Sequence, residues 1–238
     1  MFLSVIIPAY NEEKRLGGTL EAVDQYLFRQ PYDYEVVVVN DGSTDETAKL
    51  VRDYAPKIKG LRLINQEVNQ GKGWAVRRGI LETTGRIKIF MDADNSTTID
   101  HLEKMLPLFE AGYDVVIGSR RTPGAQIVIH QSGLKEFIGR LANFWIKFFA
   151  YEDSKDTQAG FKAFTESAGA KVFSRLTLKQ WGFDFEALAI AKNLKLKIGE
   201  IPIRWVNDPL SRVRPSAYFK TMLEAVQVRW NLTRGVYN

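Results

Sequence analysis

The chain alternates short, continuous apolar runs with longer segments of helical periodicity, and this alternation restricts the fold more than any other feature. The runs typical of buried strands are 2–8, 34–40, 61–65, 87–91 and 114–119. Strands of a parallel sheet are buried on both faces, so they appear as unbroken apolar runs. We expect helices over 12–28, 46–54, 74–83 and 99–110, with Asn11 and Asp45 able to cap the first two. The pattern predicts an α/β fold with a mostly parallel sheet and right-handed crossovers.

The second half of the chain departs from this rhythm. Residues 120–132 are polar and irregular, so we expect a loop there, and residues 133–150 follow the spacing of an amphipathic helix. A strand near 161–164, two helices, a strand over 197–206 and a last helix from about Ser216 come next. Since the chain contains no internal repeat and no clear linker, we expect a single domain over 1–238 with a C-terminal elaboration.

Composition narrows the chemistry. The 238 residues include no cysteine, which excludes disulfides, zinc–thiolate sites and a thiol nucleophile. The two histidines, His101 and His130, lie far apart in sequence, and we expect them at the surface or in helix caps rather than in catalysis. The net charge of +5 favours an anionic partner, such as a phosphorylated substrate, a nucleic acid or an acidic membrane surface.

The first ten residues, MFLSVIIPAY, lack the basic region of a signal peptide and reach Pro8 too early for one. No apolar run approaches the length of a membrane-spanning helix. We therefore expect a protein of the cytosolic compartment that can lie on a membrane without crossing it.

The apolar run 87–91 stops abruptly at two aspartates, Asp92 and Asp94. Ligands of parallel sheets collect beyond the carboxyl ends of the strands, which is where these two carboxylates would stand. Mg²⁺ is commonly held by one or two carboxylates together with substrate phosphates. The motif thus predicts a metal site that serves a nucleotide diphosphate. The alternative is that Asp94 or Asn95 only caps the next helix.

Polar motifs follow other strands of the same sheet. PAYNEE at 8–13 and DGSTD at 41–45 would place carboxylates and amides on one rim, where they suit a nucleoside, or they are turn and cap chemistry. NQGKG at 69–73 precedes a helix, so its backbone can approach a phosphate and Lys72 can add a charge, or it is a plain turn with a solvated lysine. The sequence has neither a G-x-G-x-x-G fingerprint nor a P-loop, which argues against a dinucleotide fold and a P-loop enzyme.

Taken in this order and spacing, PAYNE, NDGST, N-x-GKG and DADNS resemble the family-two glycosyltransferases, which have a GT-A fold. The second half is similar to the polyprenyl-phosphate sugar synthases of that family, and its DTQ-x-GFK motif is most similar to the dolichyl-phosphate β-glucosyltransferases. The motifs that carry this second likeness are GSR at 118–120, DTQAGFK at 156–162 and WGFDFE at 181–186. The resemblance covers nearly the whole chain.

The resemblance implies a donor site in residues 1–119. It assigns Asp41 to the uracil edge and Glu12 to the ribose, and it assigns Mg²⁺ or Mn²⁺ to Asp92 and Asp94 against the diphosphate, with Asp94 the more direct ligand. Mannosyl-phosphate synthases usually place Gln where this chain has Ser96, which favours UDP-glucose over GDP-mannose and leaves a third protein ligand open. The remaining residues assigned to the nucleotide sugar are Pro8, Tyr10, Lys72, Ser211 and Arg212.

Residues 120–238 are assigned by the resemblance to the acceptor and the membrane surface. A lipid phosphate needs cations and an apolar path for its tail, and Arg suits phosphate through its planar donor fork. The residues that fit this need are Arg120, Arg121 and the basic side chains of the 133–150 helix, among them Lys135 and Arg140. This helix and the C-terminal one have the aromatic and basic pattern of in-plane interfacial helices, although periodicity alone would favour packing on the core.

The implied reaction is inverting transfer of a hexose, most simply glucose from UDP-glucose, to dolichyl or polyprenyl phosphate. A phosphate monoester is already largely ionised at pH 7, so no strong general base is required. The resemblance places Asp156 with Arg120 at the reaction centre. We then expect Asp156 and Asp184 to orient the acceptor or to hold basic residues in place.

Three other interpretations stay open. A GDP-mannose-dependent synthase is the first alternative, and it is weakened by Ser96 at the position where such enzymes usually have Gln. A nucleotidyltransferase would use the aspartates and the glycine-rich turn but not DTQ-x-GFK, and a non-catalytic basic module would bind membranes and leave the acidic rim without a role. Nucleic-acid binding fits the charge, but no recognised motif supports it.

Overall fold

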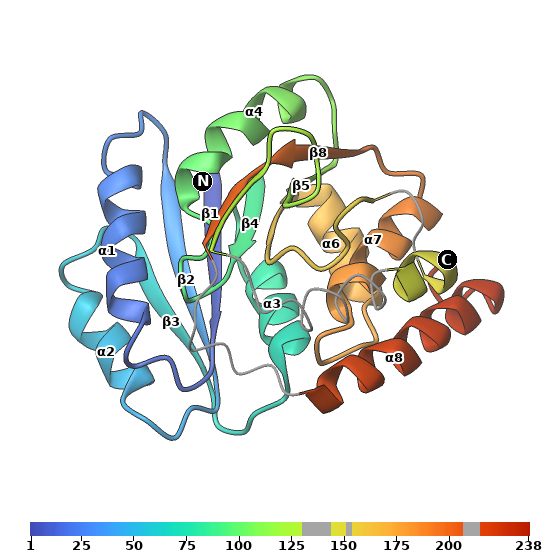
Figure 1. Ribbon diagram of the computed structural model, residues 1–238. Coiled ribbons are helices and arrows are strands. Elements are labelled where there is room, and N and C mark those ends of the chain that lie inside the picture. Colours follow the sequence, from blue (N-terminus) through green and yellow to red (C-terminus); the bar gives the residue numbers. More distant parts are fainter. Residues whose placement is uncertain (130–143, 151–153, 207–214) are drawn as a thin grey trace.

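The computed structural model describes residues 1–129, 144–150, 154–206 and 215–238 (Figure 1). Its centre is a seven-stranded sheet with the order β3-β2-β1-β4-β7-β5-β8. The strands of this sheet are β1 (Leu3–Ala9), β2 (Tyr34–Asp41), β3 (Leu61–Gln66), β4 (Ile87–Met91), β5 (Val115–Ser119), β7 (Phe161–Thr165) and β8 (Ile198–Pro202). Only β7 runs antiparallel to its neighbours, so the predicted mostly parallel sheet is confirmed.

Helices cover both faces of the sheet (Figure 1). One face packs against α1 (Leu16–Leu27), α2 (Thr47–Tyr54) and α4 (Leu102–Glu110), which follows the 3₁₀ turn Ile99–His101. The other face packs against α3 (Lys72–Leu81), α6 (Glu166–Arg175) and α7 (Phe183–Asn193), with α8 (Pro215–Thr233) outside α7. Residues 144–149 are also helical.

The central strands are continuous apolar runs because each side chain has a core to enter. Val5 and Ile7 of β1 lie in the core under α1 and α2, whereas Ile6 lies in the core under α3. All residues of β1, β2 and β4 are buried. Burial on both faces is the reason that a strand of this kind has no alternation of polar and apolar residues.

Some local expectations are wrong. The first helix begins at Leu16 rather than residue 12, because Asn11 is in the left-handed region with φ 56° and its side-chain oxygen accepts a hydrogen bond from the Thr44 backbone instead of capping the helix. His101 is buried rather than at the surface; it stands at the N-cap position of α4, the other place expected for it, although its side chain makes no cap hydrogen bond there and its Nε2 accepts one from the Arg204 backbone. His130 lies outside the described residues.

The segment expected as one strand over 197–206 is two strands. β8 ends at Pro202, and β9 (Arg204–Val206) leaves the main sheet to pair in parallel with β6 (Gln126–Ile129). β6 lies inside the stretch that the sequence predicted to be an irregular loop. Pro202 has no N–H to donate to the hydrogen bonds of the sheet, and the next residue, Ile203, is buried. These two features allow the chain to change sheets here. The exchange brings Trp205 next to the carboxyl edge of the main sheet.

Candidate active site

A cavity of about 410 Å³ opens at the carboxyl edge of the sheet. Since β1, β2, β4 and β5 all point the same way, the segments that follow them meet at this edge. The cavity brings together most of the residues assigned from the sequence, namely Pro8, Tyr10, Glu12, Asp41, Lys72, Asp92, Asp94 and Arg120. Asp156 lies behind Arg120, while Lys135, Arg140, Ser211 and Arg212 lie outside the described residues.

Asp92, directly after β4, forms an ion pair across the cavity wall. Its Oδ1 accepts a hydrogen bond from Lys72 Nζ at 2.6 Å, and that ammonium lies 5.3 Å from the centre of the Trp181 ring. Burial would lower the pKa of Lys72, but the nearby carboxylates of Asp92 and Asp184 outweigh burial and raise it. Lys72 is therefore a fixed cation, and the alternative of a solvated lysine in a plain turn is wrong.

Asp94 stands two residues further on and is held by backbone contacts. Its Oδ1 accepts a hydrogen bond from the Ser96 N–H at 3.0 Å, and the Thr19 hydroxyl of α1 donates to the carbonyl of Ala93 at 2.7 Å. Burial, and then the charge of Asp92, raise the pKa of the Asp94 carboxyl. The next helical turn begins at Ile99 without a side-chain cap, so the capping alternative for Asp94 is wrong.

These two carboxylates fit a hard divalent cation. Their oxygen donors are the type that Mg²⁺ and Mn²⁺ prefer, and a cation would favour the ionised form of Asp94, whose pKa is raised first by burial and then by the charge of Asp92. The described residues contain no cluster of three or more acidic or histidine side chains suited to a metal. The site therefore matches a cation that takes one or two protein carboxylates and completes its shell with phosphate oxygens.

Asp41, at the end of β2, shapes the turn that carries Lys72. Its carboxylate accepts hydrogen bonds from the side chain of Gln66 at 2.6 Å and from the backbone N–H groups of Gln70 and Gly71 at 2.8 Å each. Gly71 has φ 105°, and a Cβ there would lie 2.4 Å from the carbonyl oxygen of Lys179. This glycine is thus required by the backbone conformation and by close packing.

Glu12 carries an ionic partner that sequence reasoning missed. Arg15 donates two hydrogen bonds to its carboxylate, at 2.6 and 2.7 Å, and lies 4.0 Å from Asp94. Arg15 therefore stands between the residue assigned to the ribose and the residue assigned to the metal. No motif in the sequence marked it, because a single arginine at the start of a helix is common.

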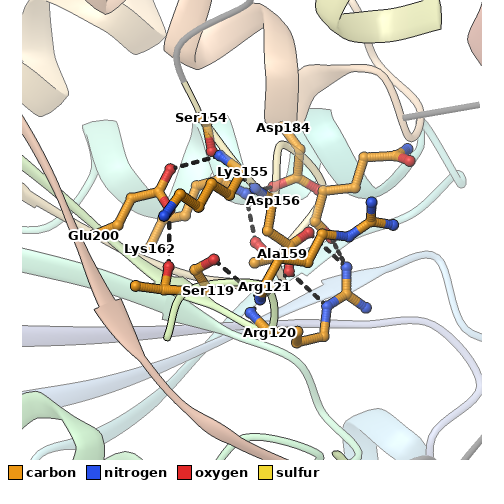
Figure 2. A network of polar contacts seen from close by, with 12 residues as sticks. Ser119, Arg120, Arg121, Ser154, Lys155, Asp156, Ala159, Lys162, Asp184 and Glu200 are labelled. Carbon is orange, nitrogen blue, oxygen red and sulfur yellow. Dashed lines mark hydrogen bonds and ion pairs between the residues drawn. The ribbon is translucent and has the colours of Figure 1, made fainter. Parts of the chain in front are cut away.

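Arg120 follows β5 and is fixed by Asp156, as Figure 2 shows. The guanidinium donates to both carboxylate oxygens, at 2.7 and 2.8 Å, and the Arg120 backbone N–H donates at 3.0 Å. Burial would raise the pKa of Asp156, but Arg120 outweighs burial and lowers it to about 2. The Arg120 guanidinium also lies 5.2 Å from the centre of the Trp205 ring. The structure thus shows Asp156 holding a basic residue in place.

A second buried ion pair, Lys162 with Asp184, lies next to the 156–160 turn (Figure 2). Lys162 is fully buried and donates to Asp184 Oδ1 at 2.6 Å and to the carbonyl oxygen of Ala159. Burial raises the pKa of Asp184 although Lys162 and Lys72 oppose this. Asp184 therefore also holds a basic residue, which in turn supports the turn above it.

Other cavity residues were not assigned from the sequence. Gln158 and Gly160 belong to the DTQAGFK motif and Trp181 to WGFDFE, so the motifs themselves were the available signal. A Cβ at Gly160 would lie 2.1 Å from Asp92 Oδ2, which shows how closely the turn covers this carboxylate. Trp205 had no sequence signal, because its position depends on the exchange of sheets after β8.

Comparison with solved structures identifies the fold. The crystal structure of glucosyl-3-phosphoglycerate synthase from Mycobacterium tuberculosis in complex with Mn²⁺, UDP and glucosyl-3-phosphoglycerate matches with a TM-score of 0.69, at 20% identity, over 98% of this chain and 80% of that chain. Staphylococcus aureus TarS 1–349 in complex with UDP-GlcNAc matches with a TM-score of 0.61, at 20% identity, over 95% of this chain and 66% of that chain. The fold is that of the GT-A glycosyltransferases, as the resemblance implied.

The sequence comparisons go further. The model of the family described as glycosyl transferase family 2 matches residues 4–176. The dolichyl-phosphate β-glucosyltransferase of Drosophila melanogaster is 37% identical to this chain, over 90% of this chain and 69% of that protein. The Homo sapiens enzyme of the same name is 34% identical to this chain, over 90% of this chain and 70% of that protein. The one from Dictyostelium discoideum is 32% identical over 100% of this chain and 76% of that protein. The chain belongs to glycosyl transferase family 2 and is a glycosyltransferase, so the predicted class of enzyme is confirmed.

Proposed function

We propose that this chain transfers glucose from UDP-glucose to dolichyl or polyprenyl phosphate and inverts the anomeric centre, giving a β-linked lipid-phosphate glucose. The observation that supports this most is that one cavity joins the acidic pair Asp92 and Asp94 to the fixed cation Arg120. A donor diphosphate and an acceptor phosphate need these two kinds of group side by side. The similarity to dolichyl-phosphate β-glucosyltransferases over 90% or more of the chain supports the choice of donor and acceptor.

The donor binds, in this proposal, along residues 1–119. Asp41 and Glu12 would take the uracil edge and the ribose, beside Pro8 and Tyr10, and Lys72 would face the diphosphate from its place against Asp92. Asp94, with Asp92, would hold Mg²⁺ or Mn²⁺. The metal, when bound, neutralises negative charge on the diphosphate. Ser211 and Arg212, outside the described residues, keep their proposed place at the diphosphate.

The acceptor phosphate binds at Arg120 in the half formed by residues 120–238. Asp156 holds the guanidinium in one orientation through two hydrogen bonds and accepts a third from the Arg120 backbone, so the arginine enters the complex with little loss of side-chain freedom. We propose that Lys135 and Arg140, which lie outside the described residues, add positive charge to the acceptor site beside Arg120. Because the acceptor is ionised, the site needs to position it and to stabilise charge rather than to remove a proton.

The lipid tail calls for an apolar surface, and α8 offers one. Phe219, Leu223 and Trp230 are each more than half exposed, whereas Ala225 and Val228 on the other side of the helix are buried. Phe144 and Phe148 are exposed on the neighbouring helical segment, whose Trp145 donates to the Met222 carbonyl. We propose that these exposed side chains lie on the cytoplasmic face of a membrane. None of the helices in the described part of the chain is both long enough and apolar enough to span a bilayer.

The test is a transfer assay with purified protein, Mn²⁺ and polyprenyl phosphate in detergent, with labelled UDP-glucose or GDP-mannose as donor. We expect a lipid-linked sugar from UDP-glucose, with a β linkage, and loss of transfer when EDTA removes the metal. Product from GDP-mannose alone would replace the proposed donor, and the absence of lipid-linked sugar from both donors would overturn the proposal.

A further inference from the structure

The segment 177–182, between α6 and α7, forms one wall of the cavity through Gln180 and Trp181. On its inner side it packs on the start of α3, where the Trp74 N–H donates to the carbonyl of Lys179 at 3.2 Å. The Trp181 ring covers Lys72, whose ammonium bonds to Asp92. The position of this wall therefore bears directly on the cation that faces the diphosphate.

The two ends of the segment are held by buried carboxylates from two different helices. At the first end, Glu186 of α7 accepts hydrogen bonds from the N–H groups of Thr177 and Leu178 at 3.0 and 2.8 Å. At the second end, Glu224 of α8 accepts one from the Gly182 N–H at 3.0 Å. Because these backbone N–H groups have their hydrogen bonds to buried carboxyl oxygens, each side chain is an effective anchor.

Glu224 and Gly182 are packed so closely that the contact leaves no room for another side chain. Glu224 is 8% exposed, and a Cβ at Gly182 would lie 2.6 Å from its Oε2. Burial raises the pKa of Glu224, whereas the hydrogen bond from Gly182 lowers it. Glu224 lies more than 40 residues after this loop, on a helix that does not line the cavity, and neither the motifs nor the reaction assigned it a role.

We infer that Glu224 is a positioning residue of the active site. By fixing the Gly182 end of the wall it keeps the Trp181 ring over Lys72, and so keeps the ammonium directed at Asp92 and at the donor diphosphate. The inference rests on the proposed function in one respect, which is that UDP is the nucleotide used to measure it.

The first test is a double-mutant cycle read by calorimetric titration of UDP in the presence of Mn²⁺. Loss of a hydrogen bond to a charged group predicts that Glu224→Ala weakens UDP binding by about tenfold. Glu224→Gln should recover most of the affinity, because its amide oxygen still accepts from Gly182. Because the effect is transmitted through Trp181, adding Glu224→Ala to Trp181→Ala should weaken binding by less than about twofold. Gln227→Ala, an exposed change on the same helix, is the matched control.

The second test needs no ligand and reads the Trp181 indole N–H resonance, assigned by Trp181→Phe. We expect this resonance to move in Glu224→Ala and to return in Glu224→Gln, with unchanged positions in Gln227→Ala. The inference would be overturned if Glu224→Ala lowered the UDP affinity by the same factor with and without Trp181. It would also be overturned if the Trp181 resonance did not move in Glu224→Ala. If the Trp181 resonance moves in Glu224→Ala but the wild-type protein does not bind UDP, the positioning role of Glu224 stands and the proposed donor is wrong.

Discussion

Replacing Gly160 with alanine tests the proposed role of the Asp92 carboxylate with a single methyl group. A Cβ at this position would lie 2.1 Å from Oδ2, 2.5 Å from Cγ and 2.7 Å from Oδ1 of Asp92. Gly160 is not among the glycines with positive φ, so alanine can adopt its backbone conformation. The substitution therefore acts through the collision with Asp92 and not through backbone strain.

The size of the effect follows from the distance that the carboxylate must move. Since side-chain carbons essentially never approach within 3.0 Å, the Asp92 carboxylate, which also bonds to Lys72, has to withdraw from Gly160 by about 1 Å. A displacement of this size at a reaction centre costs about 100-fold in rate. Overpacking by one methyl group lowers the free energy of unfolding by about 1–3 kcal/mol, which leaves most domains of this size folded.

The assay is glucose transfer to polyprenyl phosphate under saturating UDP-glucose, with thermal unfolding measured on the same samples. Gly18→Ala is the matched control, because a Cβ at Gly18 on α1 meets nothing within 4 Å. We expect Gly160→Ala to be folded and about 100-fold slower and Gly18→Ala to keep its rate. A folded Gly160→Ala protein with the original turnover would refute the assignment of Asp92 to the reaction centre.

Two further substitutions test the charges of the site. Asp94→Asn should lower Mn²⁺-dependent turnover by about 100-fold or more. Its melting temperature should not fall, because burial and Asp92 raise the pKa of Asp94 and its ionised form therefore destabilises the fold at neutral pH; unchanged turnover would remove Asp94 from the mechanism. Arg120 lowers the pKa of Asp156 to about 2, so this carboxylate stabilises the fold above its unfolded pKa. As the pH falls from about 4 to 2, urea titration should show a loss of about 2 kcal/mol that Asp156→Asn lacks. An identical acid profile in both proteins would contradict this reasoning.

The strands and the edge of the sheet could be predicted because single physical rules determine them. A strand buried on both faces is mainly apolar, so the runs that form β1, β2 and β4 were visible even though they also bury Ser4, Glu35 and Lys88. The carboxyl ends of parallel strands share one edge, so Asp41 and Asp92 could be placed together from the sequence, whereas Arg120 was placed there only by the family resemblance.

Contacts between distant segments could not be predicted, because they depend on how the elements pack. Lys72 was expected to face either a phosphate or solvent, yet it bonds to Asp92, and Arg15 had no signal at all. Periodicity identified the apolar stripe of α8, but periodicity alone would have packed it on the core. The structure instead buries Ala225 and Val228 and leaves Phe219 and Leu223 exposed, since two faces of this helix are apolar.

The place of β7 in the sheet also determines the order in which a growing chain can assemble the active site. β1, β2, β3 and β4 pair with one another and can form their sheet as soon as they are synthesised. β5 pairs with β7 and β8, and both come later in the chain, so β5 has to wait for them with its edge unpaired. Arg120 is therefore synthesised early but set opposite the aspartates late, once β7 has joined the two parts of the sheet. Until then the edge of β4 that β7 later covers is open to pairing with another chain.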